Sequence, residues 1–522
     1  MRPARAARLA SIFVACLPVV AAAQVAAVPA TTQPTSKIVK DNWDAAYLDG
    51  HRAGYVRLKV EEFTLAGGAK VIRASQEMNL NVRRGNDVNS IMVVTGTDEL
   101  PDGKLIGVFM QQTLGKGVQQ VVHGKVQGNQ LQLTAQGPQG NFNKLIPWDP
   151  RVVSAAGEAE LLSKRDPKPK PGDKFDYYTF NPVVNTIVPI HVTVESFEEV
   201  PIRTANGVER PRLLRVSAVP DEIFQVQLPS QLLWFDANYE LRRSMANLPG
   251  IGYLVLEKST ETAVKQPIAR ELLVDIMERQ SIKLNRRITT PHALSEIVYR
   301  ITLDDKDPAK TFAQDDRQSV TNIQGKTFDL TVRAVRTPPA QEPPGTVPPG
   351  PEFTTSNYFL TSDDTLVKQR AQAAIGGETD PWRKALLIER WVHTNMKVLN
   401  FSEAMVPAFK VAQTLEGDCT EYSMLTAAMC RAVGVPSRTV IGLVYVDVPA
   451  PRQPLFGFHM WTEVWVRGAW VSIDSTLGQG NIGPAHLKIA DASWHDQRAM
   501  TPLLPLMRVI VAKPMIEPVS VK

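Results

Sequence analysis

A cysteine, a histidine and an aspartate with distinctive neighbours, Cys419, His459 and Asp474, occur in this order in the C-terminal part of this chain of 522 residues. Cys419 lies in the segment Gly-Asp-Cys-Thr-Glu, His459 in Phe-His-Met-Trp, and Asp474 directly after Val-Ser-Ile. A thiol becomes a nucleophile when a nearby base takes its proton, and a carboxylate can hold an imidazole in place for that task. The three residues therefore predict a nucleophile, a base and an orienting acid, in that order along the chain.

Two cysteines, Cys419 and Cys430, lie at opposite ends of one predicted helix. The helix begins next to Asp418 and ends at Gly434, which Pro436 follows closely. Cys419 falls in the first turn, where unpaired N–H groups and the helix dipole stabilise a thiolate and can donate to an oxyanion. Cys430 falls in the last turn, roughly 16 Å away along the axis, which is too far for a disulfide. We therefore expect two free thiols, a reactive Cys419 and a buried Cys430.

A predicted hairpin decides whether His459 and Asp474 can meet. The segment Trp465-Val466-Arg467-Gly468-Ala469-Trp470 is typical of a turn centred on Arg467-Gly468. A loop of two or four residues places His459 and Asp474 on the same face of the sheet, as diagonal neighbours roughly 7–8 Å apart at the backbone. A three-residue loop would place them on opposite faces. The pairing of base and acid therefore requires an even-length turn.

The motifs around these residues resemble the core of the transglutaminase-like superfamily, over roughly residues 355–515. The similarity rests on three segments, which are Gly417-Asp418-Cys419-x-Glu421 with Arg431-Ala432-x-Gly434-Val435-Pro436-x-Arg438, His459-x-Trp461-x-Glu463-Val464, and Trp470-Val471-x-Ile473-Asp474-x-Thr476. The resemblance implies a papain-like cysteine fold, with Cys419 as nucleophile, His459 as general base and acid, and Asp474 orienting the ring. The chain departs from the family pattern at Ser475, where proline is frequent, and has no basic residue closely before Gly417.

Three further residues are candidates for completing the site. Gln413 precedes Cys419 by six residues and could offer its side-chain amide to an oxyanion, although an exposed loop glutamine is the simpler interpretation. Tyr422 and Trp461 are expected to shape or pack the site rather than to do chemistry.

No cofactor and no metal are expected from the sequence. The letters of residues 478–483 match a dinucleotide fingerprint, but no strand–helix–strand unit surrounds them. The histidines lack metal-ligand spacing, and His486 and His495 are expected to have no suitable partners for such a site.

The N-terminus is typical of an export signal. Three arginines precede an apolar stretch from Leu9 to Ala23, which ends in small residues suited to cleavage. A membrane span needs roughly 20 apolar residues, so this stretch is short for one. We expect a signal peptide at 1–23, a disordered spacer rich in Ala, Thr and Pro at 24–40, and a mature chain without a transmembrane segment, located in the periplasm or secreted.

The spacing of apolar residues changes along the chain, from a period of two residues in the first part to a helical period after the proline-rich segment. The first part alternates apolar and polar residues between turn residues, which predicts antiparallel strands. The expected domains are a β-sheet domain at 41–275, as one body or as two halves divided near 164–174, a small β unit at 276–336, a proline-rich linker at 337–352 and the transglutaminase-like domain at 353–522. The fold class is α+β and multidomain, with a β-rich N-terminal region.

Within the C-terminal part, helical periodicity begins after the proline-rich segment. A helix is predicted from Asp380 to about Met396, with Asp380 as its cap and proline at its first position. Strands are predicted at 438–446, 459–466 and 470–474, and a last strand at Met507–Ala512.

Composition and motifs together favour an exported thiol enzyme that acts on a protein or peptide substrate. Hydrophobic residues make up 43% of the chain and charged residues 21%, which is ordinary for a globular protein, and the net charge of +5 makes nucleic acid an unsuitable partner. Cys419 would form a thioester with an amide carbonyl, which water or an amine then resolves. The alternative is a catalytically silent protein of the cell envelope that uses its β-rich region for binding or assembly.

Overall fold

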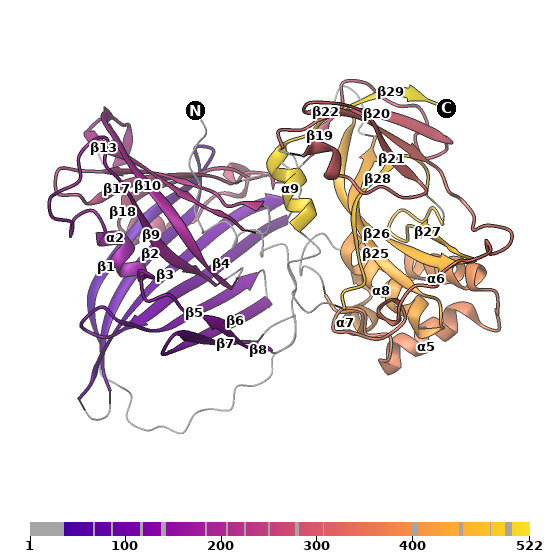
Figure 1. Ribbon diagram of the computed structural model, residues 1–522, viewed down its shortest axis with the longest axis horizontal. Coiled ribbons are helices and arrows are strands. Elements are labelled where there is room, and N and C mark those ends of the chain that lie inside the picture. Colours follow the sequence, from indigo (N-terminus) through magenta and orange to yellow (C-terminus); the bar gives the residue numbers. More distant parts are fainter. Residues whose placement is uncertain are drawn as a thin grey trace. The chain divides into compact units, whose positions relative to one another are not determined.

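The computed structural model describes residues 36–65, 68–84, 87–114, 118–136, 142–182, 185–204, 207–223, 226–248, 251–276, 281–305, 307–398, 406–447, 453–480, 482–495 and 504–522. The chain divides into two compact units, Met1–Ile276 and Met277–Lys522, called here the N-terminal and the C-terminal unit (Figure 1). The predicted signal peptide and most of the predicted spacer lie outside the described residues. Strand β1 begins at Ser36, within the predicted spacer segment.

One antiparallel sheet of fourteen strands dominates the described part of the N-terminal unit. Its first eight strands follow the chain as a meander, and β1 joins this meander to the later strands by pairing with β18. The strands are β1 (Ser36–Leu48), β2 (His51–Thr64), β3 (Lys70–Arg84), β4 (Asp87–Glu99), β5 (Leu105–Leu114), β6 (Val118–Gln127), β7 (Gln130–Gln136), β8 (Phe142–Pro147), β9 (Lys174–Asn181), β10 (Thr186–Glu199), β13 (Arg212–Pro220), β16 (Gln231–Phe235), β17 (Leu241–Leu248) and β18 (Gly252–Ser259). Strands on both sides of the 164–174 loop therefore belong to one sheet.

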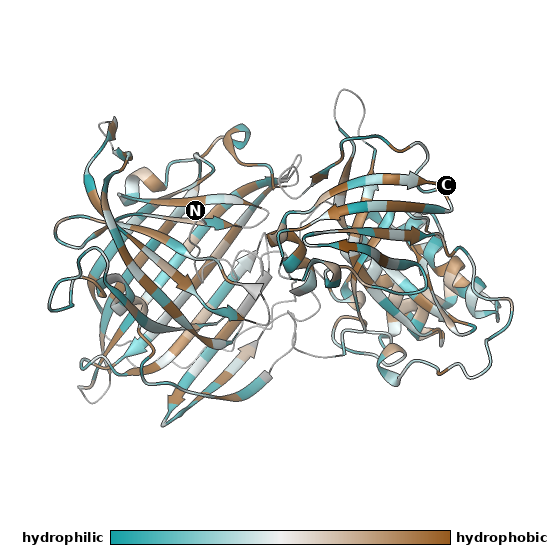
Figure 2. Cartoon of the chain, turned by 45° about the horizontal axis from the view of Figure 1, so that its top comes forward, coloured by the Kyte–Doolittle hydropathy of each residue, from teal (hydrophilic) through white to brown (hydrophobic). Residues whose placement is uncertain are grey.

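Alternating side chains explain why these segments form strands. In β2, Val56, Leu58 and Val60 are buried, while the residues between them are more exposed. Bands of opposite hydropathy alternate in the same way along the strands in Figure 2. Short elements complete this unit: the hairpins β11–β12 (Ile202–Thr204, Gly207–Glu209) and β14–β15 (Glu222–Ile223, Val226–Gln227), the helices α2 (Ala155–Glu160) and α3 (Glu261–Val264), and the 3-10 turn η1 (Arg270–Leu272).

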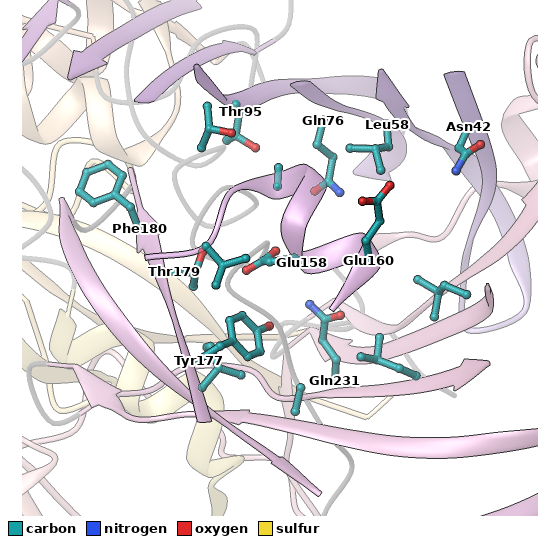
Figure 3. A pocket seen from close by; sticks show the side chains of 18 of the residues that line it. Asn42, Leu58, Gln76, Thr95, Glu158, Glu160, Tyr177, Thr179, Phe180 and Gln231 are labelled. Carbon is teal, nitrogen blue, oxygen red and sulfur yellow. The ribbon is translucent and has the colours of Figure 1, made fainter. Parts of the chain in front are cut away.

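The sheet of the N-terminal unit is curled around a cavity of about 620 Å³. Strands that are far apart in the sheet order, β2–β5 on one side and β9, β10, β13, β16 and β17 on the other, line the same space together with α2. Figure 3 shows polar Asn42, Gln76 and Gln231 in this lining beside aromatic Tyr177 and Phe180. The interior of the sheet is thus a mixed polar and apolar surface.

Two sheets and five helices form most of the described C-terminal unit. The larger sheet has the order β19-β26-β25-β28 with β27 on β26, and the other has the order β21-β22-β20-β29. The strands are β19 (Ile282–Lys283), β20 (Glu296–Thr302), β21 (Gln318–Gln324), β22 (Thr327–Arg333), β25 (Ser437–Val446), β26 (Leu455–Val466), β27 (Ala469–Ile473), β28 (His486–Ala492) and β29 (Met515–Val521). The helices are α5 (Thr365–Ile375), α6 (Pro381–Asn395), α7 (Ala408–Thr414), α8 (Cys419–Ala432) and α9 (Leu504–Ala512), with two short parallel strands, β23 (Lys397–Val398) and β24 (Glu416–Gly417), and the 3-10 turns η2 (Pro308–Lys310) and η3 (Pro351–Phe353).

A shared apolar core joins the two sheets of the C-terminal unit. Tyr299 of β20 and Leu330 of β22 pack in one cluster with Leu443 of β25, Phe456 of β26 and Leu487 of β28, and all five are almost fully buried. The segment before the proline-rich stretch is therefore packed onto the same sheet that carries His459. Residues 334–350 have neither helix nor strand.

The α+β multidomain class predicted from the sequence is confirmed, and one element differs. Helix α6 starts after its cap Asp380 as predicted, and strands β25, β26 and β27 lie where the sequence predicts them. The predicted strand Met507–Ala512 is wrong, because this segment belongs to helix α9. A short apolar run has no period that separates a strand from a buried helix. None of the helices in the described ranges is long and apolar enough to cross a membrane.

Candidate active site

Helix α8 begins with Cys419, and its start is fixed by a reciprocal cap. The Asp418 side chain accepts from the N–H of Thr420 at 2.8 Å, while Glu421 Oε2 accepts from the N–H of Asp418 at 3.0 Å. Gly417 is required next to this cap, because a Cβ on it would lie 2.4 Å from Glu421 Cβ and its φ is +154°. The predicted helix start is confirmed. The Asp-x-x-Glu spacing of residues 418–421 is the sequence signal of this capping box.

Glu421 is buried beneath the start of the helix. Its Oε1 accepts from the N–H of Val406 at 3.0 Å, and its side chain is almost completely shielded. Burial, together with the neighbouring Asp418, raises the pKa of this carboxyl well above its ordinary value. Glu421 therefore anchors the segment before α8 to the helix rather than offering a free charge to the site.

The β26–β27 hairpin brings His459 to Asp474 as the even-turn prediction requires. Val466 pairs with Ala469 and Trp465 with Trp470, so the turn has two residues, Arg467 and Gly468. His459 Nε2 lies 2.8 Å from Asp474 Oδ2. The hairpin prediction is thus confirmed, and the two side chains share one face.

The Cys419 thiol lies beside the same imidazole. Cys419 lies close enough to His459 to raise the pKa of the imidazole, and Nε2 of the same ring is engaged by Asp474. Cys419 is partly exposed, whereas His459 is buried and Asp474 completely so. The thiol is therefore the member of the three that a molecule from outside can reach.

Electrostatics in this buried cluster favours charged His459 beside charged Asp474. Burial alone would lower the pKa of His459, but the charge and hydrogen bond of Asp474, with a smaller effect of Cys419, raise it to about 10. Burial would raise the pKa of Asp474, yet the bonds from His459 and His486 hold it far below its ordinary range. An imidazolium held next to a thiol is the arrangement that stabilises a thiolate.

Asp474 also receives two backbone donors. Its Oδ1 accepts from the N–H groups of Thr476 at 2.9 Å and Leu477 at 3.2 Å. Its Oδ2 accepts from His459 and from His486. With both oxygens engaged twice, the carboxylate is fixed in one orientation.

His486 was expected to have no suitable partners for a metal site, whereas the structure places it beside Asp474 and His459. Its Nε2 lies 3.0 Å from Asp474 Oδ2, and its side chain is completely buried. Strand β28, which carries it, pairs with β25 far earlier in the chain. The alternation His486-Leu487-Lys488-Ile489 looks like an ordinary strand with one wet face, so no local signal could reveal that its polar face is buried.

Trp461, Tyr422 and Gln413 have different surroundings. The Trp461 ring stacks on His459 at 6.2 Å between centroids, with an angle of 25° between planes, and is buried. Tyr422 is buried in α8, and burial raises the pKa of its phenol. Gln413 is exposed on α7. The ring of Trp461 thus packs against the imidazole, and the role of Gln413 stays a prediction.

Ser475, the departure from the family pattern, ties the chain after Asp474 to α8. Its hydroxyl lies 2.8 Å from that of Thr426 and 3.4 Å from the carbonyl oxygen of Tyr422. On the other side, His393 Nδ1 of α6 lies 3.0 Å from the Ser475 carbonyl oxygen. These contacts hold the backbone next to Asp474 between two helices.

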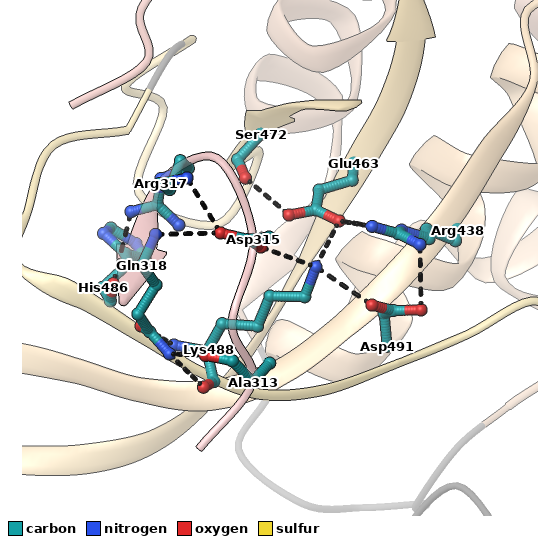
Figure 4. Close-up of polar contacts among 10 residues, drawn as sticks. All are labelled: Ala313, Asp315, Arg317, Gln318, Arg438, Glu463, Ser472, His486, Lys488 and Asp491. Carbon is teal, nitrogen blue, oxygen red and sulfur yellow. Dashed lines mark hydrogen bonds and ion pairs between the residues drawn. The ribbon is translucent and has the colours of Figure 1, made fainter. Parts of the chain in front are cut away.

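A buried network of charges fixes the strands behind the site. Lys488 of β28 contacts Glu463 of β26 at 2.9 Å, Asp491 at 3.0 Å and Asp315 at 3.1 Å, and Arg438 of β25 contacts Glu463 at 2.8 Å (Figure 4). Burial would raise the pKa of Glu463, but Lys488 and Arg438 lower it to about 2. Buried Lys488 and Glu463 each contact residues of opposite charge, so the network links the three strands.

His459, Asp474 and His486 are also close enough to be tested as a metal-binding set. One donor atom of each lies within 4.8 Å of the others, and all three residues are buried. Two imidazoles and a carboxylate are donors that zinc accepts. The Nε2 atoms of His459 and His486 both donate to the Asp474 carboxylate, which accounts for the positions of the two rings without an ion.

Comparisons with known proteins agree with this geometry in the C-terminal unit. Residues 368–475 match the family model of the transglutaminase-like superfamily, a range that contains Cys419, His459 and Asp474. An uncharacterized protein of Haemophilus influenzae is 33% identical over 84 residues, which are 15% of this chain and 23% of that protein. The chain thus spans less than a quarter of the length of this curated relative.

Two solved structures have a distant likeness. A candidate cysteine protease from Cytophaga hutchinsonii is 17% identical, over 38% of this chain and 80% of its own, with a TM-score of 0.27. A β-barrel-like protein of a domain of unknown function from Brucella abortus is 10% identical, over 42% of this chain and 95% of its own, with a TM-score of 0.31.

The C-terminal part of this chain carries a transglutaminase-like domain, following the β-rich N-terminal unit.

Proposed function

We propose that the protein is a transglutaminase-like thiol enzyme that cleaves or exchanges amide bonds in a protein or peptide substrate. The observation that carries the proposal is the hydrogen bond from His459 to the buried Asp474, beside the partly exposed Cys419 at the start of α8, whose proximity raises the pKa of His459. Nucleophile, base and orienting carboxylate are the parts that acyl transfer through a cysteine requires.

In this mechanism the Cys419 thiolate attacks the carbonyl carbon of an amide. The oxyanion that forms is stabilised at the start of α8, where the Thr420 N–H is taken by Asp418, so the Cys419 N–H is the donor we expect. His459 then gives its proton to the departing amine, which leaves a thioester on Cys419. Water or a second amine attacks the thioester, His459 takes the proton of that nucleophile, and Cys419 is released as the thiolate with which the cycle began.

We also propose that the enzyme works outside the cytoplasm, in the periplasm or as a secreted protein. The arginines and the apolar stretch at the N-terminus support this location. Two free cysteines in the described residues fit an exported protein only if one is buried and the other is used, which is the arrangement of Cys430 and Cys419.

A binding role is a second candidate for the N-terminal unit. The cavity of about 620 Å³ has the size of a small-ligand site and mixes polar and aromatic side chains (Figure 3). Such a unit could bind part of a cell-envelope substrate, or act by itself in assembly if the thiol site were silent.

A thiol-directed electrophile tests the enzyme proposal. Iodoacetamide should label the folded wild type at one cysteine, the labelling should vanish in Cys419→Ala, and it should persist in Cys430→Ala. Equal labelling of all three proteins, or none in the wild type, would contradict the proposal and favour the binding role. Peptide hydrolysis measured beside amine incorporation into glutamine side chains then separates the two outcomes of the thioester.

A further inference from the structure

Asp474 is shared by two imidazoles, and the proposed mechanism uses only one of them. His459 Nε2 and His486 Nε2 both lie within hydrogen-bond distance of the same oxygen, Oδ2, at 2.8 and 3.0 Å. An ionised carboxylate only accepts, so each nitrogen must carry a hydrogen that it donates. The bond from His486 is therefore directed at the atom that orients the base.

The two histidines differ in charge although they share an acceptor. Burial, ahead of the opposing effect of Asp474, lowers the pKa of His486 to about 4, while that of His459 is raised to about 10. His486 is thus a neutral ring with its hydrogen on Nε2, and His459 is the ring that carries the positive charge. A neutral donor can hold the carboxylate without competing for its charge.

His486 is held from several sides, by Trp461 and by residues outside the matched family range. Its ring meets Trp461 at 5.2 Å and His292 at 5.5 Å, both edge to face. Its carbonyl oxygen accepts from Arg317 Nη2 at 3.3 Å (Figure 4). The same nitrogen donates to the Gly483 carbonyl at 3.2 Å.

The loop before His486 is also fixed. Tyr299 donates from its hydroxyl to the carbonyl oxygen of Pro484 at 3.1 Å. A Cβ on Gly483 would lie 2.2 Å from the His292 carbonyl oxygen, so only glycine allows this approach. Residues of the 282–336 segment thus position the backbone that carries His486.

We propose that His486 is a positioning residue of the thiol site, which fixes the Asp474 carboxylate so that Oδ2 faces His459. The inference rests on the proposed function for its catalytic meaning, but the geometry it describes can be measured without any substrate. Arg317, Tyr299 and His292 extend this positioning to the 282–336 segment, so the site depends on more of the chain than residues 368–475.

Two amide variants test the proposal, because they differ only in reach. In His486→Gln the side-chain amide can take the place of Nε2, whereas in His486→Asn it is too short. We expect His486→Asn to lower the alkylation rate of Cys419 by about tenfold or more, and His486→Gln to recover most of it. Thermal unfolding of each variant shows whether it is folded, and His486→Leu replaces the asparagine variant if that one is not.

The titration of His459, followed by NMR of the labelled imidazoles, supplies a readout that needs no activity. The titratable groups around it are Cys419 of α8, Asp474, His486 of β28, His292 and, through Asp474, Glu389 of α6. We expect the pKa of His459 to fall in His486→Asn and to return in His486→Gln. His292→Asn is the comparison variant, since it removes a partly buried imidazole of the same cluster that makes no hydrogen bond to Asp474 but keeps the backbone carbonyl that Gly483 approaches, and it should shift the pKa of His459 less.

Unchanged His459 titration and alkylation in a folded His486→Asn would overturn the positioning role. Equal losses in the glutamine and asparagine variants would do the same, because they would indicate a packing effect instead. If the wild-type Cys419 shows no special reactivity, the proposed function fails, and the His459 titration still decides whether His486 positions Asp474.

Discussion

The two ends of helix α8 hold chemically identical side chains in opposite surroundings. At the first residue, Cys419 is partly exposed, next to a capping box and close enough to His459 to raise the pKa of that ring. Near the last turn, Cys430 is completely buried, and burial raises its pKa to about 12. The position on the helix and the neighbouring strand therefore decide which of the two thiols can react, because the residue type is the same.

The largest expected effect separates the two cysteines directly. Cys419→Ser should abolish thioester formation and reduce turnover by up to roughly 10⁶-fold, to background, because a serine hydroxyl lacks the acidity that His459 can exploit. Cys430→Ala should leave turnover within a factor of two or so of wild type, because its side chain faces the core. Mass spectrometry of the trapped acyl-enzyme and steady-state rates measure both. A loss of similar size in both variants would show that the two thiols do not differ in function.

The next effect tests what makes the first end reactive. Asp474→Asn keeps the size of the side chain but removes the charge that holds His459 protonated, so we expect a fall in rate on the order of 10⁴-fold. Alkylation of Cys419 should slow in parallel, while the unfolded protein should react at both cysteines as the wild type does. A folded Asp474→Asn variant that keeps the wild-type alkylation rate would show that the carboxylate does not influence the reactivity of Cys419.

The pH dependence of stability gives a smaller effect with a defined sign. The pKa of His459 is raised from 6.5 to about 10 in the folded state. Its stabilisation is therefore complete below about pH 6.5 and is lost as the pH rises through 10. The free energy of unfolding from urea titrations should decline between these values in the wild type, and less steeply in His459→Gln. A parallel decline in the two proteins would assign the change to other groups.

The smallest effect belongs to the buried end. Cys430→Ala removes one buried sulfur and should lower the free energy of unfolding by about 1 kcal/mol. Cys430→Ser buries a hydroxyl instead and should cost about 1–3 kcal/mol, with more loss than alanine unless the hydroxyl finds a partner. Chemical denaturation of the three proteins measures the difference. A serine variant as stable as wild type would show that this end of α8 is more accessible than its burial indicates.

Local signals were sufficient to predict the helix and the hairpin. Asp418 and Gly434 mark the ends of α8, and the dipeptide Arg467-Gly468 marks the turn, because caps and tight turns are formed by residues close in sequence. The contact of His459 with Asp474 then follows from strand alternation. The transglutaminase-like resemblance added the roles of these residues, which stay proposals.

Contacts between distant segments could not be predicted. His486 meets Asp474 only because β28 pairs with β25, and the fourteen-stranded sheet is a single body only because β1 pairs with β18. Neither pairing has a signature in the residues themselves, since any alternating strand can pair with many others. Helix α9 could not be predicted for a different, local reason. Its short apolar run is equally compatible with a strand.

The two-residue turn at Arg467-Gly468 gives the β26–β27 hairpin a parity. Each residue added to the turn moves the following side chains to the other face of the sheet, so one insertion separates His459 from Asp474 and a second one reunites them on one face. A change of one residue in the length of this turn therefore separates the two side chains, so only insertions of two residues keep His459 and Asp474 on one face. In evolutionary terms the turn is restricted in length as well as in residue type, because Gly468 has a φ of +83° and a Cβ on it would lie 2.9 Å from Pro343 Cδ.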